Sequence, residues 1–207
     1  MSQSIKVILF DLGNVLVDVD YSIAAKRISH FCEATPSDII ARLLSTDVTR
    51  LFEEGSITPE DFFSRLQEMF NLRLSYQAFV PIWNEVFFLS SKNRFVYSLA
   101  NNLRSNYTIA ILSNINILHY EYLKKHFPVF SIFHNVFTSC LMGLVKPEPE
   151  IYKKTLIALR VSPGEVFYTD DRDDLIKSAS SLEINSFVFT DAKKLKQDLL
   201  NSGIVLS

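Results

Sequence analysis

The chain has 207 residues, of which 48% are hydrophobic and 21% are charged, and its formal net charge at pH 7 is −2. This length and apolar content are sufficient for a large buried core, and they predict one domain with a smaller insertion. The nearly balanced charge gives no general attraction to nucleic acid or to anionic membranes, so neither is expected as a partner and any anionic ligand must be held by local groups.

The cysteines and the N-terminal segment indicate a protein of the reducing cytoplasm. Cys32 and Cys140 are the only cysteines and do not form a CxxC pair, so the sequence predicts neither a disulfide framework nor a thiolate zinc site. The apolar run near the N-terminus is followed at once by Asp11, which makes it too short for a signal peptide. No segment approaches the roughly 18 apolar residues of a membrane span.

Five short apolar segments rich in Ile, Val and Phe are predicted strands, and helical patterns separate them. Strands that are apolar on both faces and joined by helices are typical of a parallel sheet covered on both sides. The sequence therefore predicts an α/β fold. The predicted strands are residues 5–10, 108–113, 135–139, 165–169 and 185–190.

The interval from residue 18 to residue 91 contains no predicted strand and is expected to form an inserted helical domain. Thr58 and Pro59 together predict a helix start, with the threonine as the N-cap. Apolar residues then recur at helical spacing from Phe62 to Phe70, and again from Phe79 to Phe87. We interpret these aromatic stripes as the core of a helical bundle rather than as a ligand pocket.

Polar side chains stand where the predicted strands end. Because ligands of open parallel sheets bind beyond the carboxyl ends of the strands, these side chains are expected to share one crevice. Taken singly, each is also typical of a turn or a helix cap, but their joint placement favours a site. The residues at these strand ends are Asp11, Ser113, Asn114, Asp170 and Asp171.

The residue types at these positions predict phosphate chemistry. Three carboxylates in one crevice repel one another unless a cation lies among them, and oxygen ligands without nearby His or Cys favour Mg²⁺. Ser113 and the amides of a helix opening directly after it would bind phosphate oxygens, and Lys146 would add positive charge. Asp11 is the candidate nucleophile, because a carboxylate can attack phosphorus and form an aspartyl-phosphate.

Four segments resemble the motifs of the haloacid dehalogenase superfamily of phosphohydrolases, and the resemblance extends over essentially the whole chain. In chain order they are "VILFDLGNVLVD", "ILSN", "GLVKPEPEIY" and "FYTDDRDD". The resemblance implies a Rossmann-like, three-layer core domain at residues 1–17 and 92–207 with parallel strand order 3-2-1-4-5. It also implies a four-helix cap domain at residues 18–91. The segments "DLGNV", "FEEGSITPEDFF" and "WNEVF" are most similar to the branch that contains α-D-glucose-1-phosphate phosphatase and the N-terminal phosphatase domain of soluble epoxide hydrolases.

The resemblance implies roles for the same polar residues. Asp11 would be the nucleophile, with Ser113 and Lys146 as catalytic groups that anchor the phosphate. Asn114, next to Ser113, is a further candidate for substrate binding. The Mg²⁺ cofactor would be held by three carboxylates and one backbone carbonyl, those of Asp11, Asp170, Asp171 and Gly13.

Two positions depart from the family pattern. The family commonly has a second aspartate two residues after the nucleophile, which protonates the leaving alcohol and then activates water, and here that position is Gly13. The fourth motif often has Asn where this chain has Leu175, so a support for the metal site or for Lys146 is lost or passes to Asp174. General acid–base catalysis contributes about 10²–10⁴-fold, so most of the catalysis would survive the first change. Glycine would also let the chain turn tightly at this point.

These observations predict a cytoplasmic Mg²⁺-dependent phosphatase that acts on a small phosphorylated metabolite through an aspartyl-phosphate on Asp11. Sugar phosphates are favoured, because an anomeric hydroxyl leaves without much protonation, and a monomer or weak dimer is expected. Asp18 or Asp20 is an alternative acid, although Asp18 is more typical of a hinge or cap position. Two other functions stay open: a catalytically weak binding or regulatory module, because of Gly13, and a metal-free 2-haloacid dehalogenase.

Overall fold

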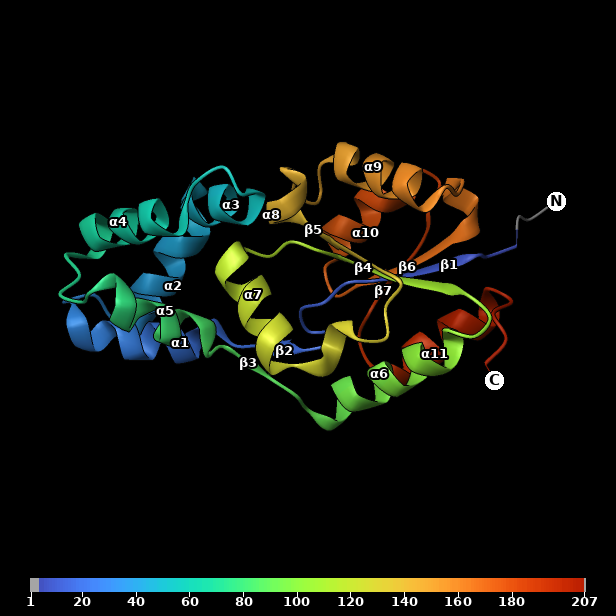
Figure 1. Ribbon diagram of the computed structural model, residues 1–207, viewed down its shortest axis with the longest axis horizontal. Helices are drawn as coiled ribbons and strands as arrows, with labels where there is room; N and C mark the ends of the chain where they lie inside the picture. The colour runs from blue at the N-terminus through green and yellow to red at the C-terminus, as the bar shows by residue number, and fades with distance from the viewer. Residues whose placement is uncertain (1–3, 207) are drawn as a thin grey trace.

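The computed structural model describes residues 4–206, and the predicted α/β fold is confirmed (Figure 1). Residues 1–3 and 207, which belong to the predicted core domain, lie outside the described residues. A five-stranded parallel sheet has the order β5-β4-β1-β6-β7, which is the predicted 3-2-1-4-5 when these strands are counted along the chain. The strands are β1 (Val7–Phe10), β4 (Thr108–Ser113), β5 (Asn135–Thr138), β6 (Val166–Asp170) and β7 (Asn185–Val188).

The apolar core lies on both faces of the sheet because its strands alternate their side chains between the two faces. In the central strand β1, Ile8 and Phe10 pack on α6 and α11, whereas Val7 and Leu9 pack on α9 and α10. The three layers bury β1 completely, and the carboxyl ends of the strands point toward the inserted helices (Figure 1). The covering helices are α6 (Ser91–Leu103), α9 (Pro149–Leu159), α10 (Asp173–Ser180) and α11 (Ala192–Asn201).

The remaining helical elements of the core follow β4 and β5 or precede β5 and β6. None of the helices within residues 4–206 combines the length and the apolarity needed to cross a membrane. These elements are α7 (Ile117–His126), α8 (Ser139–Met142) and the 3₁₀ turns Pro128–Phe130 and Pro163–Glu165.

Residues 18–91 form five helices, where four were expected. The additional helix arises because Thr46 has an extended backbone, with φ −114° and ψ 154°, which divides α2 from α3. The separate core of this segment supports the proposed division into a cap domain and a core domain. Its helices are α1 (Tyr21–Ile28), α2 (Pro36–Ser45), α3 (Asp47–Glu54), α4 (Pro59–Phe70) and α5 (Tyr76–Asn84), with a 3₁₀ turn at Ser29–Phe31.

The core of the inserted segment is built from aromatic rings, as the helical stripes predicted. Phe62 stacks on Phe52 with a centroid distance of 4.3 Å and lies 5.0 Å from the ring of Trp83. Helix α4 begins at Pro59 as predicted, and the side chain of Thr58 accepts a hydrogen bond from the backbone of Asp61. The stripes are therefore bundle core.

The chain enters and leaves the inserted segment through a short antiparallel ribbon that the sequence did not predict. Strand β2 (Asp18–Val19) pairs with β3 (Phe87–Phe88). Each strand has two residues, which is too short to show the alternation of apolar and polar residues by which a strand is predicted. Asp18 forms an ion pair of 2.6 Å with Lys92 at the start of α6, while Asp20 caps α1. Asp18 therefore fixes the hinge, and both carboxylates are engaged outside the crevice.

Candidate active site

A cavity of about 190 Å³ lies at the carboxyl end of the parallel sheet, between the strand ends and the inserted helices. Residues from both parts of the chain line it, so it is closed on one side by the core and on the other by the cap. Every candidate site residue taken from the sequence lines this cavity: Asp11, Gly13, Ser113, Asn114, Lys146, Asp170 and Asp171.

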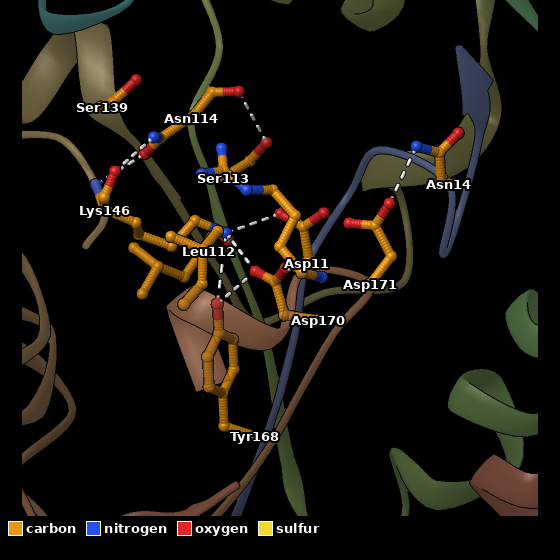
Figure 2. A network of polar contacts seen from close by, with 12 residues as sticks. Asp11, Asn14, Leu112, Ser113, Asn114, Ser139, Lys146, Tyr168, Asp170 and Asp171 are labelled. Carbon is orange, nitrogen blue, oxygen red and sulfur yellow. Dashed lines mark hydrogen bonds and ion pairs between the residues drawn. The ribbon is translucent and has the colours of Figure 1, made fainter. Parts of the chain in front are cut away.

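Lys146 lies at the centre of a buried polar network at the floor of the cavity (Figure 2). Its Nζ donates to Asp11 Oδ1 at 2.7 Å and to Asp170 Oδ2 at 2.6 Å. It also lies 3.0 Å from the Leu112 carbonyl and 3.2 Å from the Tyr168 hydroxyl. The Tyr168 hydroxyl donates to the same Asp170 oxygen at 2.5 Å. A buried ammonium is stable only with such partners, so this network fixes the positions of both carboxylates.

Asp171 completes the acidic cluster and is less buried than Asp11 and Asp170 (Figure 2). Its carboxylate accepts a hydrogen bond of 2.9 Å from Asn14 Nδ2. One oxygen each of Asp11, Asp170 and Asp171 lie within 4.8 Å of one another. Three carboxylates face one ammonium, so negative charge is in excess and the donors are all oxygens. This donor set fits a hard divalent cation such as Mg²⁺.

The electrostatics of the cluster agree with this excess of negative charge. Burial raises the pKa of Asp11 to about 7, although the Lys146 ammonium opposes the shift, and the Asp170 carboxylate adds to it. Burial disfavours the charged form of Lys146, yet the two carboxylates paired with it raise its pKa above the ordinary value. Burial also raises the pKa of Asp171. A cation among these groups would favour their ionised forms.

The turn after Asp11 is made by Asn14 rather than by Gly13. Asn14 has a φ of +56°, in the left-handed region that asparagine tolerates, whereas Gly13 is not among the described residues with positive φ. A Cβ on Gly13 would meet Val19 Cγ2 at 3.5 Å and Asp11 Oδ2 at 3.9 Å, both ordinary contacts. The tight turn expected at Gly13 is therefore made by Asn14, and a Cβ at residue 13 fits beside Asp11.

Ser113 and Asn114 end strand β4 as predicted, but the helix that follows begins later. Helix α7 starts at Ile117 with Asn116 as its N-cap, so its amides do not follow Ser113 directly. Asn114 holds the backbone of Lys146 through two hydrogen bonds, donating to its carbonyl and accepting from its N–H, each at 2.8 Å. Asn114 thus positions the lysine loop. Ser113 lines the cavity, and its hydroxyl donates to the Asn114 carbonyl at 3.4 Å.

The position that departs from the family pattern in the fourth motif is filled by an apolar side chain. Leu175 is buried and lines the cavity, and its carbonyl accepts a hydrogen bond from Tyr152 at 3.1 Å. Asp174 instead binds Arg172, with distances of 3.1 Å to Nε and 2.7 Å to Nη2. Asp174 therefore does not replace the missing support of Lys146, which comes from Tyr168 and Asn114.

The cap contributes cavity residues that the sequence did not single out, among them Tyr21 of α1 and Glu53 of α3. Burial raises the pKa of Glu53 to about 7, although Arg172 and Lys146 oppose the shift. Burial and the nearby Glu53 carboxylate raise the pKa of the Tyr21 hydroxyl. The sequence contains no spacing that would connect Tyr21 and Glu53 with the strand-end residues. They reach the cavity only through the placement of helices α1 and α3.

His119 also lines the cavity, although the sequence assigned it no role. It is buried, its ring stacks on Trp83 at 5.2 Å, and its Nε2 lies 2.9 Å from the Trp83 carbonyl. Its Nδ1 lies 3.0 Å from Asn116 Nδ2. A carbonyl only accepts and an amide nitrogen only donates, so these partners define a neutral imidazole with the proton on Nε2. Burial agrees, lowering the pKa of His119 to about 4.

Comparison with known proteins identifies a family over most of the chain. A family model described as haloacid dehalogenase-like hydrolase matches residues 5–182. The chain is similar to a D-ribitol-5-phosphate phosphatase of Bacteroides thetaiotaomicron, with 26% identity over 204 residues, covering 94% of this chain and 97% of that protein. It is also similar to a sesquiterpene phosphatase of Aspergillus oryzae, with 22% identity and 93% of each chain covered.

The fold of this chain is also similar to that of a solved structure. It is a HAD family enzyme from Bacteroides thetaiotaomicron in complex with magnesium and inorganic phosphate. The TM-score is 0.80 and the sequence identity 27%, with 91% of this chain and 96% of that chain covered. The similarity therefore includes both the sheet and the inserted helices.

Proposed function

The chain belongs to the haloacid dehalogenase-like hydrolases, and on that premise we propose that it is a Mg²⁺-dependent phosphatase acting on a small phosphorylated metabolite. The observation that carries the proposal is the buried contact of Lys146 with both Asp11 and Asp170, with Asp171 close enough to share a cation with them. Charged groups held in this way can stabilise a transferring phosphoryl group without reorganising.

In this proposal Asp11 is the nucleophile. A carboxylate oxygen of Asp11 attacks phosphorus while the bond from phosphorus to the ester oxygen breaks, which gives an aspartyl-phosphate and an alcohol. Water then attacks the phosphorus of that intermediate, and the Asp11 carboxylate leaves as inorganic phosphate forms. The strand end holds Asp11 in place, because its N–H donates to the Thr169 carbonyl of β6 at 2.9 Å.

The other strand-end residues bind the phosphate and the cation. Ser113 supplies a hydroxyl donor to the phosphate oxygens, Lys146 neutralises charge, and Asn114 holds the lysine in position. A Mg²⁺ ion held by these residues would supply positive charge that offsets the repulsion between the carboxylates and the phosphate. Its ligands would be the carboxylates of Asp11, Asp170 and Asp171 and the carbonyl of Gly13.

For the substrate we propose a phosphorylated sugar or sugar alcohol. The D-ribitol-5-phosphate phosphatase relative, by its name, acts on such a compound. A cavity of about 190 Å³ suits a phosphate with a short carbon chain rather than a polymer. We also propose a cytoplasmic enzyme that is a monomer or weak dimer, and the free thiols of Cys32 and Cys140 agree with a reducing compartment.

The proposal is tested by measuring phosphate release from ribitol 5-phosphate, sugar 1-phosphates, sugar 6-phosphates and p-nitrophenyl phosphate, with Mg²⁺ and with EDTA. Asp11→Asn is expected to lower turnover by at least about 10³-fold, since it removes the nucleophile. Asp20→Asn is the matched control, because Asn caps a helix as well as Asp does and Asp20 is engaged outside the cavity.

Two results would contradict the proposal. Full activity of Asp11→Asn would exclude the aspartyl-phosphate, and full activity in EDTA would exclude the cation. Metal-free release of chloride from a 2-haloacid, without phosphate release from any ester, would instead identify a dehalogenase.

A further inference from the structure

Hydrolysis of an alkyl phosphate needs a group that gives a proton to the leaving oxygen and later takes one from water, because an alkoxide is a poor leaving group. Gly13 has no side chain for this task. Asp18 and Asp20 are engaged outside the cavity. The strand-end acids Asp11 and Asp170 are tied to Lys146, and Asp171 accepts a hydrogen bond from Asn14 and is one of the proposed ligands of the cation. The group must therefore come from elsewhere in the cavity wall.

We propose that Glu53 of the cap helix α3 is the catalytic acid and base of this protein, an inference that rests on the proposed phosphatase function. Glu53 lines the same cavity as Asp11, Ser113 and Lys146, and its carboxyl lies close enough to Lys146 to interact with the charge of the ammonium. It enters from the cap, the side of the cavity across from the strand ends. The alcohol part of a substrate whose phosphate contacts the strand ends would extend toward it.

The position of Glu53 is fixed by the docking of α3 onto α8 of the core. The hydroxyl of Ser139 donates to the Glu53 carbonyl at 2.5 Å and accepts from the Ile115 N–H at 2.9 Å. Two residues further on, Gly55 has a φ of +80°, and a Cβ there would lie 2.4 Å from the Cys140 carbonyl. This close approach leaves little freedom to the end of the helix, so Glu53 faces the cavity from a rigid support.

The other groups of the cavity wall that carry a proton are unsuited to the task. His119 is a neutral imidazole with both ring nitrogens hydrogen-bonded. Burial raises the pKa of Tyr21, which moves it further from neutrality. Arg172 stays charged and binds Asp174 through two nitrogens. Among the cavity residues outside the strand-end cluster, Glu53 alone has a carboxyl.

The surroundings of Glu53 allow it to both give and take a proton near neutral pH. Burial raises its pKa to about 7, while Arg172 and Lys146 lower it. The hydroxyl of Tyr21 of α1 interacts electrostatically with the Glu53 carboxylate. A pKa close to the working pH is the condition under which one group serves in both steps.

The protons balance over the two steps. Protonated Glu53 gives its proton to the ester oxygen as the bond from that oxygen to phosphorus breaks and Asp11 takes up the phosphoryl group. The resulting Glu53 carboxylate then removes a proton from water as the water oxygen bonds to phosphorus and the Asp11 carboxylate is released. Glu53 ends protonated, ready for the next turnover.

The first test compares Glu53→Gln with the matched control Glu54→Gln. Glu54 is next to Glu53 on α3, but its carboxylate pairs with Arg50 and Ser56 and does not line the cavity. With an alkyl phosphate as substrate, Glu53→Gln should lower kcat by about 10²–10⁴-fold at similar KM, and Glu54→Gln should have no comparable effect. With p-nitrophenyl phosphate, whose leaving group needs no proton, Glu53→Gln should give a burst of p-nitrophenol equal to the enzyme, followed by slow turnover.

The second test is rescue by Gly13→Asp, for which the structure leaves room. A carboxyl at residue 13 lies next to Asp11 and can take over proton transfer. On the alkyl phosphate, the double variant Gly13→Asp, Glu53→Gln should therefore have a kcat at least about tenfold higher than that of Glu53→Gln alone. The thermal unfolding midpoint of each variant checks that the fold is intact.

The outcomes separate this inference from the proposed function. A wild-type protein that releases no phosphate from any ester overturns the phosphatase itself. An active wild type with Glu53→Gln equally active on the alkyl phosphate overturns only the role of Glu53. A raised KM with unchanged kcat and no rescue by Gly13→Asp would assign Glu53 to substrate binding, and the proposal would again be wrong.

Discussion

The two walls of the cavity are built in different ways. On the core side, Asp11 and Asp170 are held at strand ends, and ion pairs deep in the molecule join both to Lys146 of the loop between α8 and α9. On the cap side, Glu53 and Tyr21 come from helices, and the Glu53 carboxyl forms no ion pair or hydrogen bond with any residue from 4 to 206. The first wall is fixed by the sheet and its charge network, whereas the second is fixed by how the helices dock. The position of the phosphate-binding groups therefore depends on the sheet and its ion pairs, whereas the position of Glu53 depends on the docking of α3 onto α8.

The largest expected effect comes from breaking the core-side network with Lys146→Met. Two adjacent carboxylates would remain buried without their ammonium, which costs about 3–5 kcal/mol of unfolding free energy, and loss of the charge should lower kcat by about 10²–10³-fold. Urea unfolding with and without Mg²⁺ measures the first effect. Added Mg²⁺ should recover part of the stability; an unchanged unfolding free energy in metal-free buffer would show that the network does not hold this wall.

The docking of the cap is tested next by Gly55→Ala. The positive φ and the 2.4 Å approach to the Cys140 carbonyl should together cost about 3 kcal/mol. Gly143→Ala is the matched control, because Gly143 also has a positive φ, +66°, but a Cβ there would meet nothing within 4 Å. Urea unfolding should show a clearly larger loss for Gly55→Ala. Equal losses would mean that backbone strain alone matters and that α3 is not packed tightly on α8.

The pH dependence of stability tests the contact between His119 in α7 of the core and Trp83 in α5 of the cap. The folded-state pKa of His119 is about 4, below its ordinary value of 6.5, so the unfolded chain binds more protons in this range. The contribution of His119 is thus complete above about pH 6.5 and is lost on acidification toward about pH 4. By about pH 5 the loss should be about 2 kcal/mol. Urea unfolding at about pH 7.5 and pH 5 should show a smaller pH difference for His119→Gln than for the wild type; identical differences would contradict the neutral imidazole.

The smallest expected effect is that of Ser139→Ala. Its hydroxyl joins Ile115 of the core to the Glu53 carbonyl, and its removal should cost about 1–2 kcal/mol. Ser45→Ala serves as the control, because the Ser45 hydroxyl makes only a local, exposed contact with the Arg42 carbonyl, so a change within about 0.5 kcal/mol is expected. A loss of kcat together with the loss of stability would tie the docking contact to the position of Glu53. Stability equal to that of the control would show that the contact is dispensable.

The core-side wall was predictable from the sequence because strand ends carry positional information. A buried run such as "VILF" defines a strand, and the carboxyl ends of parallel strands meet at one edge, so Asp11, Ser113 and Asp170 had to approach one another. The order of the strands followed from the resemblance to a known family. The start of helix α7 was misplaced because Asn116, not Ser113, caps it.

The cap-side wall was not predictable for physical reasons. Glu53 reaches the cavity only because Gly55 and Ser139 allow α3 to approach α8. A contact between residues so far apart in the chain leaves no local sequence pattern from which it could be predicted. His119 acquires its partners from α5 and from its own helix cap, so its spacing from other residues carried no signal. The turn at Asn14 was assigned to Gly13 because glycine is the usual residue for a tight turn, although asparagine supplies it here.

The ribbon formed by β2 and β3 means that the inserted helices begin and end at neighbouring points of the molecule. Paired strands hold their backbones about 5 Å apart, so a foreign segment with closely spaced ends can be joined at the same two positions without moving the sheet. Grafting another helical segment between Val19 and Phe87 would therefore replace the wall that faces the substrate, and the new segment would have to supply a carboxyl in place of Glu53.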